Sequence, residues 1–373
     1  MKRSPFALVL ALAGQMGQAA QGLPAVAAAT TLFTGLFAVR VHAAPVSAPE
    51  VVEQWLLPRY DALRTAADAQ KAAWEGFCRA PSVDGVAELK TRFAAVSEGW
   101  SAVEFITFGA VMQELRADRF NLFPERRNAV GRSVAELVTG DEARLQPERF
   151  RGLSAAAQGL PALERLLYDD GAEGKLVSGP EAARRCAIGL AISANLATLA
   201  GDLREGWGDR SSGLLAQLLA GKSDPDYFPD PNALLSQIAT DLAGAYQRVV
   251  DQRLLVVMGK SADEAKPLIA DRRRSGLSKA TIVAVVTSAG ELGDLLAQGL
   301  DATPRSVVVN AMEWATKVAD GLPDDIGAAA TSADGRRQLQ VAITAFKAAQ
   351  ASVADPLASG LGVPLGFNAL DGD

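Results

Sequence analysis

Apolar residues recur every three and four positions through most of the chain after residue 50, which is the period of an amphipathic helix. Val51, Trp55 and Tyr60 belong to the first such run, which ends at the Arg-Ala-Pro-Ser sequence of residues 79–82. Between residues 109 and 158 the runs shorten into small helices and turns, and strand signals are nearly absent throughout. The sequence therefore predicts an all-α fold, with long helices over residues 51–77, 83–108, 180–207, 232–258, 278–300, 304–319 and 332–357.

Residues 223–231, with the sequence SDPDYFPDP, interrupt this pattern. A proline inside a helix removes a hydrogen-bond donor and clashes with the preceding turn, so three prolines in this segment exclude a helix. Its aspartates do not have the spacing of a calcium-binding loop, and a solvated linker is the simpler interpretation. We therefore predict a linker at 223–231, between one helical bundle over residues 44–222 and a second over residues 232–373. Each half has roughly four helices, as in a four-helix bundle.

The first residues of the chain are typical of a secretory signal peptide. Lys2 and Arg3 precede an uncharged run rich in Ala, Leu and Val that extends to Val39, and a small-residue sequence follows at residues 41–45. This pattern predicts a signal peptide over residues 1–43, cleaved after Ala43, and a periplasmic protein. The apolar run is also longer than the ~20 residues that span a bilayer. An uncleaved membrane anchor is therefore the alternative, and it is the sole membrane contact that we expect.

Cleavage after Ala43 changes the chemistry available to the protein. It removes His42, which is the chain's single histidine, together with three basic residues and no acidic one, so that the net charge falls from −6 to −9. This acidic balance argues against a nucleic-acid partner. Cys78 and Cys186 are the chain's two cysteines, and in an oxidising compartment they are a candidate disulfide. Two buried free thiols are the alternative.

The segment of residues 158–169, QGLPALERLLYD, carries the most specific local pattern. Pro161 fits the first turn of a helix, and Glu164 follows near a helix N-terminus, whose dipole favours a negative charge. Leucines at helical spacing then bury one face. The pattern predicts a single carboxylate on an apolar helix, which either faces a cleft or caps the helix.

Several short motifs together resemble the imelysin family. They are residues 158–164 (QGLPALE), residues 120–124 (FNLFP), the Arg-Ser-Gly turn at 274–276, and the C-terminal residues 366–373 (GFNALDGD). The resemblance implies an exported, all-helical protein of two four-helix-bundle-like halves with a cleft between them. Family members are associated with iron-regulated uptake, the namesake was described as a metallopeptidase, and a related protein belongs to a ferrous-iron transport system. A metal-transport or other envelope protein is therefore the expected partner.

The family's hallmark is a GxHxxE motif proposed as a metal site. Gly159 and Glu164 match its glycine and glutamate, but Pro161 occupies the histidine position. A hydrolytic zinc site usually has three protein ligands, commonly histidines with a carboxylate. Residues 44–373 contain no histidine, and a disulfide would occupy both cysteines, so only oxygen ligands remain. Such ligands suit calcium, magnesium, manganese or ferric ions better than zinc. We therefore expect a non-catalytic binding or accessory protein linked to iron uptake, with an atypical metallopeptidase as the alternative.

The candidate ligand-binding residues combine this motif with the other segments. The Arg274-Ser275-Gly276 turn offers a guanidinium group and backbone N–H groups suited to a carboxylate or another anion. The alternative is that Arg274 forms an ion pair with an acid such as Asp371 and holds the halves together. Glu164 is the candidate metal ligand; the cofactor is unknown, with iron or another hard metal ion as the candidate. The full candidate set is Gly159, Glu164, Arg274, Ser275, Asn368 and Asp371.

Overall fold

The computed structural model describes residues 46–228 and 230–366, all within one compact unit, with only the backbone described at residue 232. The predicted signal peptide, Asn368 and Asp371 lie outside the described residues. Within the described residues the structure is helical, and the extended pairings are two isolated bridges, Asp209–Ser212 and Asp224–Phe228. The all-α prediction is confirmed.

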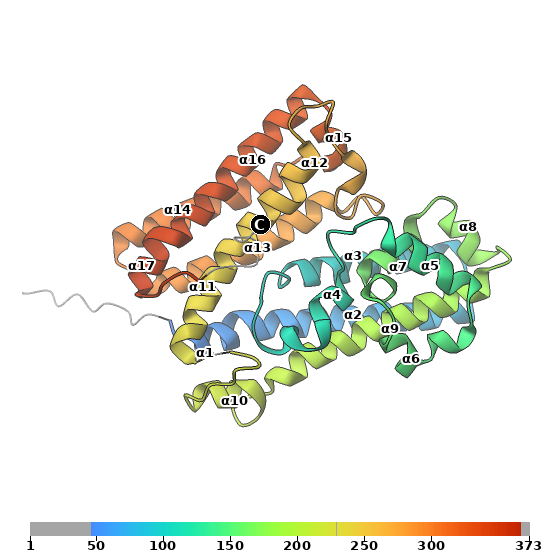
Figure 1. The fold of residues 1–373 in the computed structure, drawn as a ribbon, viewed down its shortest axis with the longest axis horizontal. Helices are drawn as coiled ribbons and strands as arrows, with labels where there is room; N and C mark the ends of the chain where they lie inside the picture. The colour runs from blue at the N-terminus through green and yellow to red at the C-terminus, as the bar shows by residue number, and fades with distance from the viewer. Residues whose placement is uncertain (1–45, 229, 367–373) are drawn as a thin grey trace, which may run out of the picture. The chain divides into compact units, whose positions relative to one another are not determined.

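Three long helices form the centre of the first helix group, which comprises α1 to α10 (Figure 1). Helix α2 packs against both α3 and α9, so these three share an apolar interior. Ser82 caps α3 by accepting a hydrogen bond from the backbone of Gly85. The helices are α1 (Ala48–Val51), a π-helical turn (Val52–Leu56), α2 (Leu57–Arg79), α3 (Val83–Ser101) and α9 (Ala182–Trp207).

Shorter helices connect α3 to α9, as the shortened periodicity predicts. Among them, α7 packs against α3, α5 and α9 and thereby brings residues 160–168 to the centre of the group. The short α-helices are α4 (Arg116–Phe120), α5 (Ala129–Thr139), α6 (Pro147–Arg151), α7 (Leu160–Tyr168), α8 (Ala172–Val177) and, after α9, α10 (Gly213–Leu219). Single 3-10 segments cover Gly109–Leu115, Glu142–Leu145 and Ala155–Ala157.

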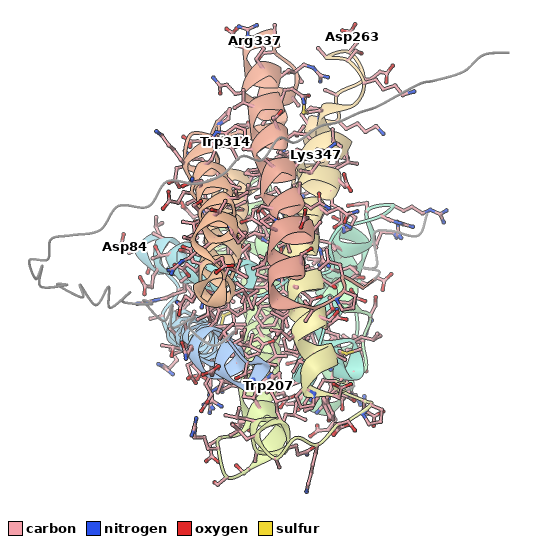
Figure 2. All side chains as sticks on the ribbon, turned by 90° about the vertical axis from the view of Figure 1, so that its left-hand side faces the viewer. Asp84, Trp207, Asp263, Trp314, Arg337 and Lys347 are labelled. Atoms are coloured by element: carbon pink, nitrogen blue, oxygen red, sulfur yellow. A yellow bond between two sulfur atoms is a disulfide. The ribbon has the colours of Figure 1, made fainter. Side chains whose placement is uncertain are left out.

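The second helix group comprises α11 to α17. Helix α14 packs between α13 and α16, and α11 packs against both α13 and α16. Figure 2 shows Trp314 on α14 and Lys347 on α16 at the outer side of this group, and the Trp314 side chain is correspondingly exposed. The helices are α11 (Pro231–Arg248), a π-helical turn (Val249–Leu255), α12 (Val256–Met258), a 3-10 turn (Pro267–Ile269), α13 (Ser278–Leu296), a 3-10 turn (Ala297–Gly299), α14 (Ala302–Asp320), α15 (Ile326–Ala330), α16 (Ala333–Ser352), a π-helical turn (Val353–Leu357) and α17 (Ala358–Leu361).

The Pro/Asp-rich segment at 223–231 separates α10 from α11, but it is anchored to the first helix group. Phe228 is buried and its ring stacks on that of Trp207, with the centroids 6.4 Å apart. The Tyr227 carbonyl accepts a hydrogen bond of 2.8 Å from the Gly109 amide. The segment therefore packs on the first helix group through Tyr227 and Phe228, whereas Ser223, Pro225, Asp226 and Asp230 are exposed, as the solvated linker predicts.

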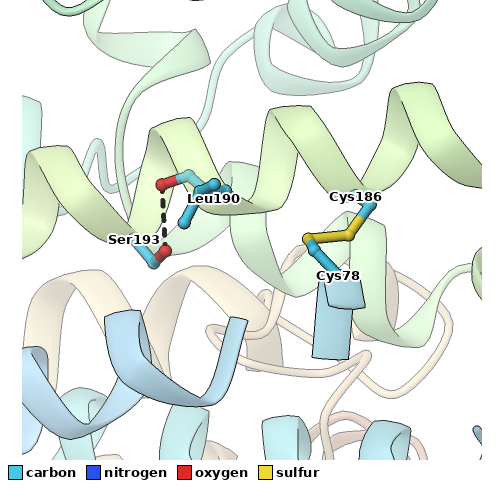
Figure 3. The surroundings of a disulfide bond; sticks show 4 residues. All are labelled: Cys78, Cys186, Leu190 and Ser193. Carbon is cyan, nitrogen blue, oxygen red and sulfur yellow. Dashed lines mark hydrogen bonds between the residues drawn. A yellow bond between two sulfur atoms is a disulfide. The ribbon is translucent and has the colours of Figure 1, made fainter. Parts of the chain in front are cut away.

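A disulfide joins Cys78 on α2 to Cys186 on α9 (Figure 3). The Cα atoms are 5.7 Å apart, and the bond closes a loop between positions 108 residues apart. The predicted pairing is therefore confirmed, and the alternative of two free thiols is wrong.

Two helical segments of the described chain, Ala182–Trp207 and Ser278–Gly299, are long and apolar enough to cross a membrane by composition alone. More than half of each apolar window is buried within the fold, at 56% and 61%. Such burial is typical of the central helices of a packed core.

Candidate functional site

Helix α7 presents Glu164 from an apolar background. Gly159 is its N-cap residue and Pro161 occupies its first turn, as predicted. The leucine side chains of α7 are fully buried. Glu164 lies beyond the first turn and is only 4% exposed. It therefore does not cap α7, and a buried carboxylate in this position needs partners elsewhere.

Those partners come from Ser275, in the turn that leads into α13 of the second helix group. Glu164 Oε1 accepts hydrogen bonds from the Ser275 backbone N at 2.9 Å and from Ser275 Oγ at 2.7 Å. Two candidate residues, separated by 111 positions in the sequence, therefore meet in the structure. Nearby, burial is the main factor that raises the pKa of Tyr168 to about 12, and the Glu164 carboxylate adds to it.

Arg274 forms an ion pair that joins the two helix groups. Its Nε donates to Asp169 Oδ1, just after α7, at 2.8 Å. Arg165 Nη1 lies 3.8 Å from the other Asp169 oxygen. An ion pair at Arg274 was one of the two interpretations of the sequence, and Asp169 provides the acid.

Gly159 contributes through close packing. A Cβ atom at this position would lie 2.5 Å from the Phe120 carbonyl oxygen and 2.8 Å from that of Arg119. Glycine therefore lets the start of α7 pass directly beside the backbone at the end of α4. Gly159 does not belong to the lining of the cleft described next.

A cleft of about 710 Å³ lies in front of Glu164. Both helix groups contribute to its lining, including the candidate residues Glu164 and Arg274 and the proline at position 161. Charged and apolar side chains share the walls. The charged residues are Arg126, Arg127, Arg165, Arg272, Arg274, Glu125, Glu164, Asp251 and Asp271, and the larger apolar ones are Leu122, Phe123, Pro124, Pro161, Val256, Leu268 and Ile269.

The donor atoms around Glu164 do not match a resident metal ion. No group of three or more His, Cys, Asp or Glu side chains with suitable geometry occurs within residues 46–228 and 230–366. Glu164 Oε1 is already hydrogen-bonded twice by Ser275, and the charged neighbours Arg165 and Arg274 are cations that repel a metal ion. The described residues therefore do not bring together the several oxygen ligands that a hard cation needs.

A buried ionic network behind the cleft was not predicted from the sequence. Arg253, only 2% exposed, places Nη2 2.5 Å from Glu104 Oε1 and 3.0 Å from Asp271 Oδ2. Burial alone would lower the pKa of Arg253, but the charges of Glu104 and Asp271 outweigh it and hold that pKa above its usual value. The pairing compensates charges that would otherwise be costly to bury.

Arg272 extends this network into the first helix group. Its Nε donates to Ser97 Oγ at 3.0 Å and its Nη2 donates to Asn121 Oδ1 at 2.7 Å. Its backbone has a φ of 52°, which is uncommon for a non-glycine residue. In the sequence, Arg272 is one member of a short basic run, and nothing local distinguishes it from its neighbours.

The fold and the sequence of this chain are similar to those of known proteins. The structure resembles that of an imelysin-like protein from Psychrobacter arcticum, with a TM-score of 0.70 and 21% identity, over 87% of this chain and 100% of that one. It also resembles a protein from Parabacteroides distasonis described as an iron-regulated protein A precursor, with a TM-score of 0.68 and 15% identity, over 84% of this chain and 95% of that one. At these identities the likeness shows a shared fold. Comparison with curated proteins gives no match. The family model for imelysin matches residues 56–353, and the chain therefore belongs to the imelysin family.

Proposed function

We propose that this protein is a non-catalytic binding or accessory protein of the bacterial envelope, linked to iron uptake, and that it binds its ligand in the cleft beside Glu164. One observation carries the proposal. A nearly buried carboxylate on the wall of a 710 Å³ cleft is held by Ser275 from the other helix group. A ligand in this cleft would contact both groups at once.

The residues around Glu164 favour binding over hydrolysis. Pro161 stands where the family motif has a histidine, and residues 44–373 contain no histidine. Zinc peptidases position a water with three protein ligands and use a nearby acid or base to move its proton. Here Ser275 occupies Oε1 of the motif carboxylate, Glu164, which leaves it poorly suited to that role.

Two further observations support the envelope and iron parts of the proposal. The pattern over residues 1–43 predicts export, and the predicted signal peptide lies outside the described residues. The similar protein from Parabacteroides distasonis is described as iron-regulated and as a precursor. Delivery to, or capture for, a metal-transport partner in the periplasm is consistent with both.

Metal analysis of protein purified from the periplasm, followed by calorimetric titration, tests the proposal. The ligands are Fe²⁺, Fe³⁺ held as its citrate complex, Ca²⁺ and Zn²⁺, and the proteins are the wild type, Glu164→Gln, and Glu173→Gln as a control on the exposed face of α8. We expect the wild type and the control to bind iron as its citrate complex. Glu164→Gln should bind it about tenfold more weakly, because the carboxylate holds Ser275 at the wall of the cleft. Absence of binding by the wild type would refute the proposal. Cleavage of a peptide library that disappears in Glu164→Gln would support the peptidase alternative instead.

A further inference from the structure

We infer that the cleft selects an organic anion with an apolar body, such as an anionic metal chelate, rather than a bare metal cation. The inference rests on the proposed function, because it assumes that the cleft is the binding site. It follows from how charges and apolar side chains are distributed over the walls of the cleft.

The carboxylates of the cleft are mostly engaged within the protein. Both Glu125 oxygens lie 3.4 Å from Arg165 Nη2. Asp271 pairs with the buried Arg253, and Glu164 accepts hydrogen bonds from the backbone N–H and the hydroxyl of Ser275. Among the acidic residues that line the cleft, Asp251 alone has no partner within the described residues. Little free negative charge is therefore available to attract a cation.

Two arginines of the cleft have no acidic partner among the described residues. Arg126 and Arg127 are exposed, and their guanidinium groups form no ion pair or hydrogen bond with the described residues. The lining contains five arginines and four carboxylates, whereas the whole chain carries a net charge of −6. A local excess of positive charge in an otherwise acidic protein concentrates anions at that place. Guanidinium groups also bind carboxylates and related anions with paired hydrogen bonds.

The second helix group gives the cleft an apolar wall. Val256, Leu268 and Ile269 line it and remain 38%, 72% and 45% exposed. Large apolar side chains that are exposed together mark binding surfaces more often than isolated ones do. Pro161 adds an apolar surface beside Glu164, where the family motif would supply a histidine. The cleft thus offers arginines for the charge of a ligand and an apolar wall for its body.

The size of the cleft is suited to a small molecule. Small-molecule sites generally have volumes of about 300–1,000 Å³ and combine apolar walls with a few polar groups. At about 710 Å³ the cleft lies within that range. An inorganic anion would leave the apolar wall in water, and a neutral apolar molecule would leave the arginines without a counter-charge.

Three fluorescent or calorimetric probes separate these contributions. Anilinonaphthalene sulfonate combines an apolar body with one negative charge, phenylnaphthylamine has nearly the same body without the charge, and inorganic sulfate has charge without the body. We expect saturable binding of one anilinonaphthalene sulfonate per protein, and binding of the other two probes at least about tenfold weaker. Equal binding of the charged and neutral naphthyl probes would overturn the inference.

Charge-reversal variants locate the binding. The double variant Arg126→Glu/Arg127→Glu should weaken binding of the sulfonate probe about tenfold, and Leu268→Ser/Ile269→Ser should weaken both naphthyl probes. The matched control, Arg79→Glu/Arg337→Glu, makes the same charge change at exposed arginines that do not line the cleft and should bind like the wild type. Near-ultraviolet circular dichroism must be unchanged, because the sulfonate probe also binds partly unfolded protein. Equal weakening in the control would overturn the inference.

The two proposals can fail separately. If free iron binds through Glu164 while the sulfonate probe ignores the arginine variants, the inference fails and the proposed function stands. If the probe behaves as expected while neither iron ions nor ferric citrate bind, the cleft takes organic anions and the link to iron fails.

Discussion

One oxygen of Glu164 accepts hydrogen bonds from both the backbone N–H and the hydroxyl of Ser275, and this contact joins α7 to the turn before α13. Glu164→Ala would leave the partly buried Ser275 amide without its acceptor, whereas the Ser275 hydroxyl would keep the Arg272 carbonyl as an acceptor. We expect it to lower the free energy of unfolding by ~1.5–3 kcal/mol, as for hydrogen bonds to a charged group. Glu164→Gln, which keeps an acceptor oxygen, should cost less. Urea denaturation at neutral pH measures both.

Ser275→Ala provides the control for this contact. Because both variants remove the same interaction, the double variant Glu164→Ala/Ser275→Ala should be more stable than the sum of the single losses predicts. Strictly additive losses would mean that Glu164 stabilises the fold through other contacts.

Gly159 tests the role of close backbone packing. In Gly159→Ala the new Cβ would lie 2.5 Å from the Phe120 carbonyl oxygen, which is backbone and cannot rotate away. Overpacking of this kind generally costs about 1–3 kcal/mol, so we expect a lower melting temperature. Gly174→Ala in α8 is the matched control, because a Cβ there meets nothing within 4 Å. The control should be neutral or slightly stabilising, and equal losses in both variants would contradict this explanation.

Asp241 on α11 predicts a pH-dependent stability. Burial raises the pKa of this carboxyl from 3.8 to about 6, although Thr107 and Gln237 donate hydrogen bonds to it. Between these two pH values the folded protein binds more protons at Asp241 than the unfolded chain does, so this contribution to stability falls as the pH rises. A shift of this size corresponds to a loss on the order of 3 kcal/mol.

Asp241→Asn isolates that contribution. From pH 4 to pH 6 the wild type should lose stability relative to Asp241→Asn. Above pH 6 the difference in unfolding free energy between the two proteins should stay constant. Denaturation curves at several pH values across this range measure it. A difference that does not vary with pH would show that Asp241 has an ordinary pKa.

The disulfide between Cys78 and Cys186 should contribute substantially to stability. It links positions 108 residues apart, and removal of a native disulfide typically costs about 2–5 kcal/mol. Cys78→Ser/Cys186→Ser should therefore melt at a lower temperature than the oxidised wild type. A reductant should bring the wild type to a similar temperature and leave the double variant unchanged. A reductant effect of equal size on both proteins would point to another cause.

The helices were predictable because their signal is local. The run beginning at Ser332 predicts a helix that the structure has as α16, with Ser332 as its cap and Leu339, Ile343 and Phe346 buried on one face. The run from Val83 extends to Phe108 in the sequence, whereas α3 ends at Ser101. The apolar residues after Ser101 continue the pattern and are buried, but they lie in an irregular segment. Periodicity alone does not distinguish such a segment from a helix.

The candidate site was predictable only in part. The motif glutamate and the Arg-Ser-Gly turn were identified as separate features, and the structure shows that Glu164 binds Ser275. The pairing of Arg274 with Asp169 required knowledge of which acid lies opposite, which depends on the packing of α7 against other helices. Arg253 and Arg272 carried no local signal, because a buried arginine resembles a surface arginine until its remote partners are known.

The network of Glu104, Arg253, Asp271 and Arg272 also bears on how such a chain can be changed over evolution. The first helix group contributes one of these four charges and the second contributes three. Neither group alone has a neutral set, so each would carry an uncompensated charge in its interior if it were paired with an unmatched counterpart. If one group were exchanged for the equivalent part of a relative, a buried charge would stay uncompensated unless the relative carries matching charges at these positions.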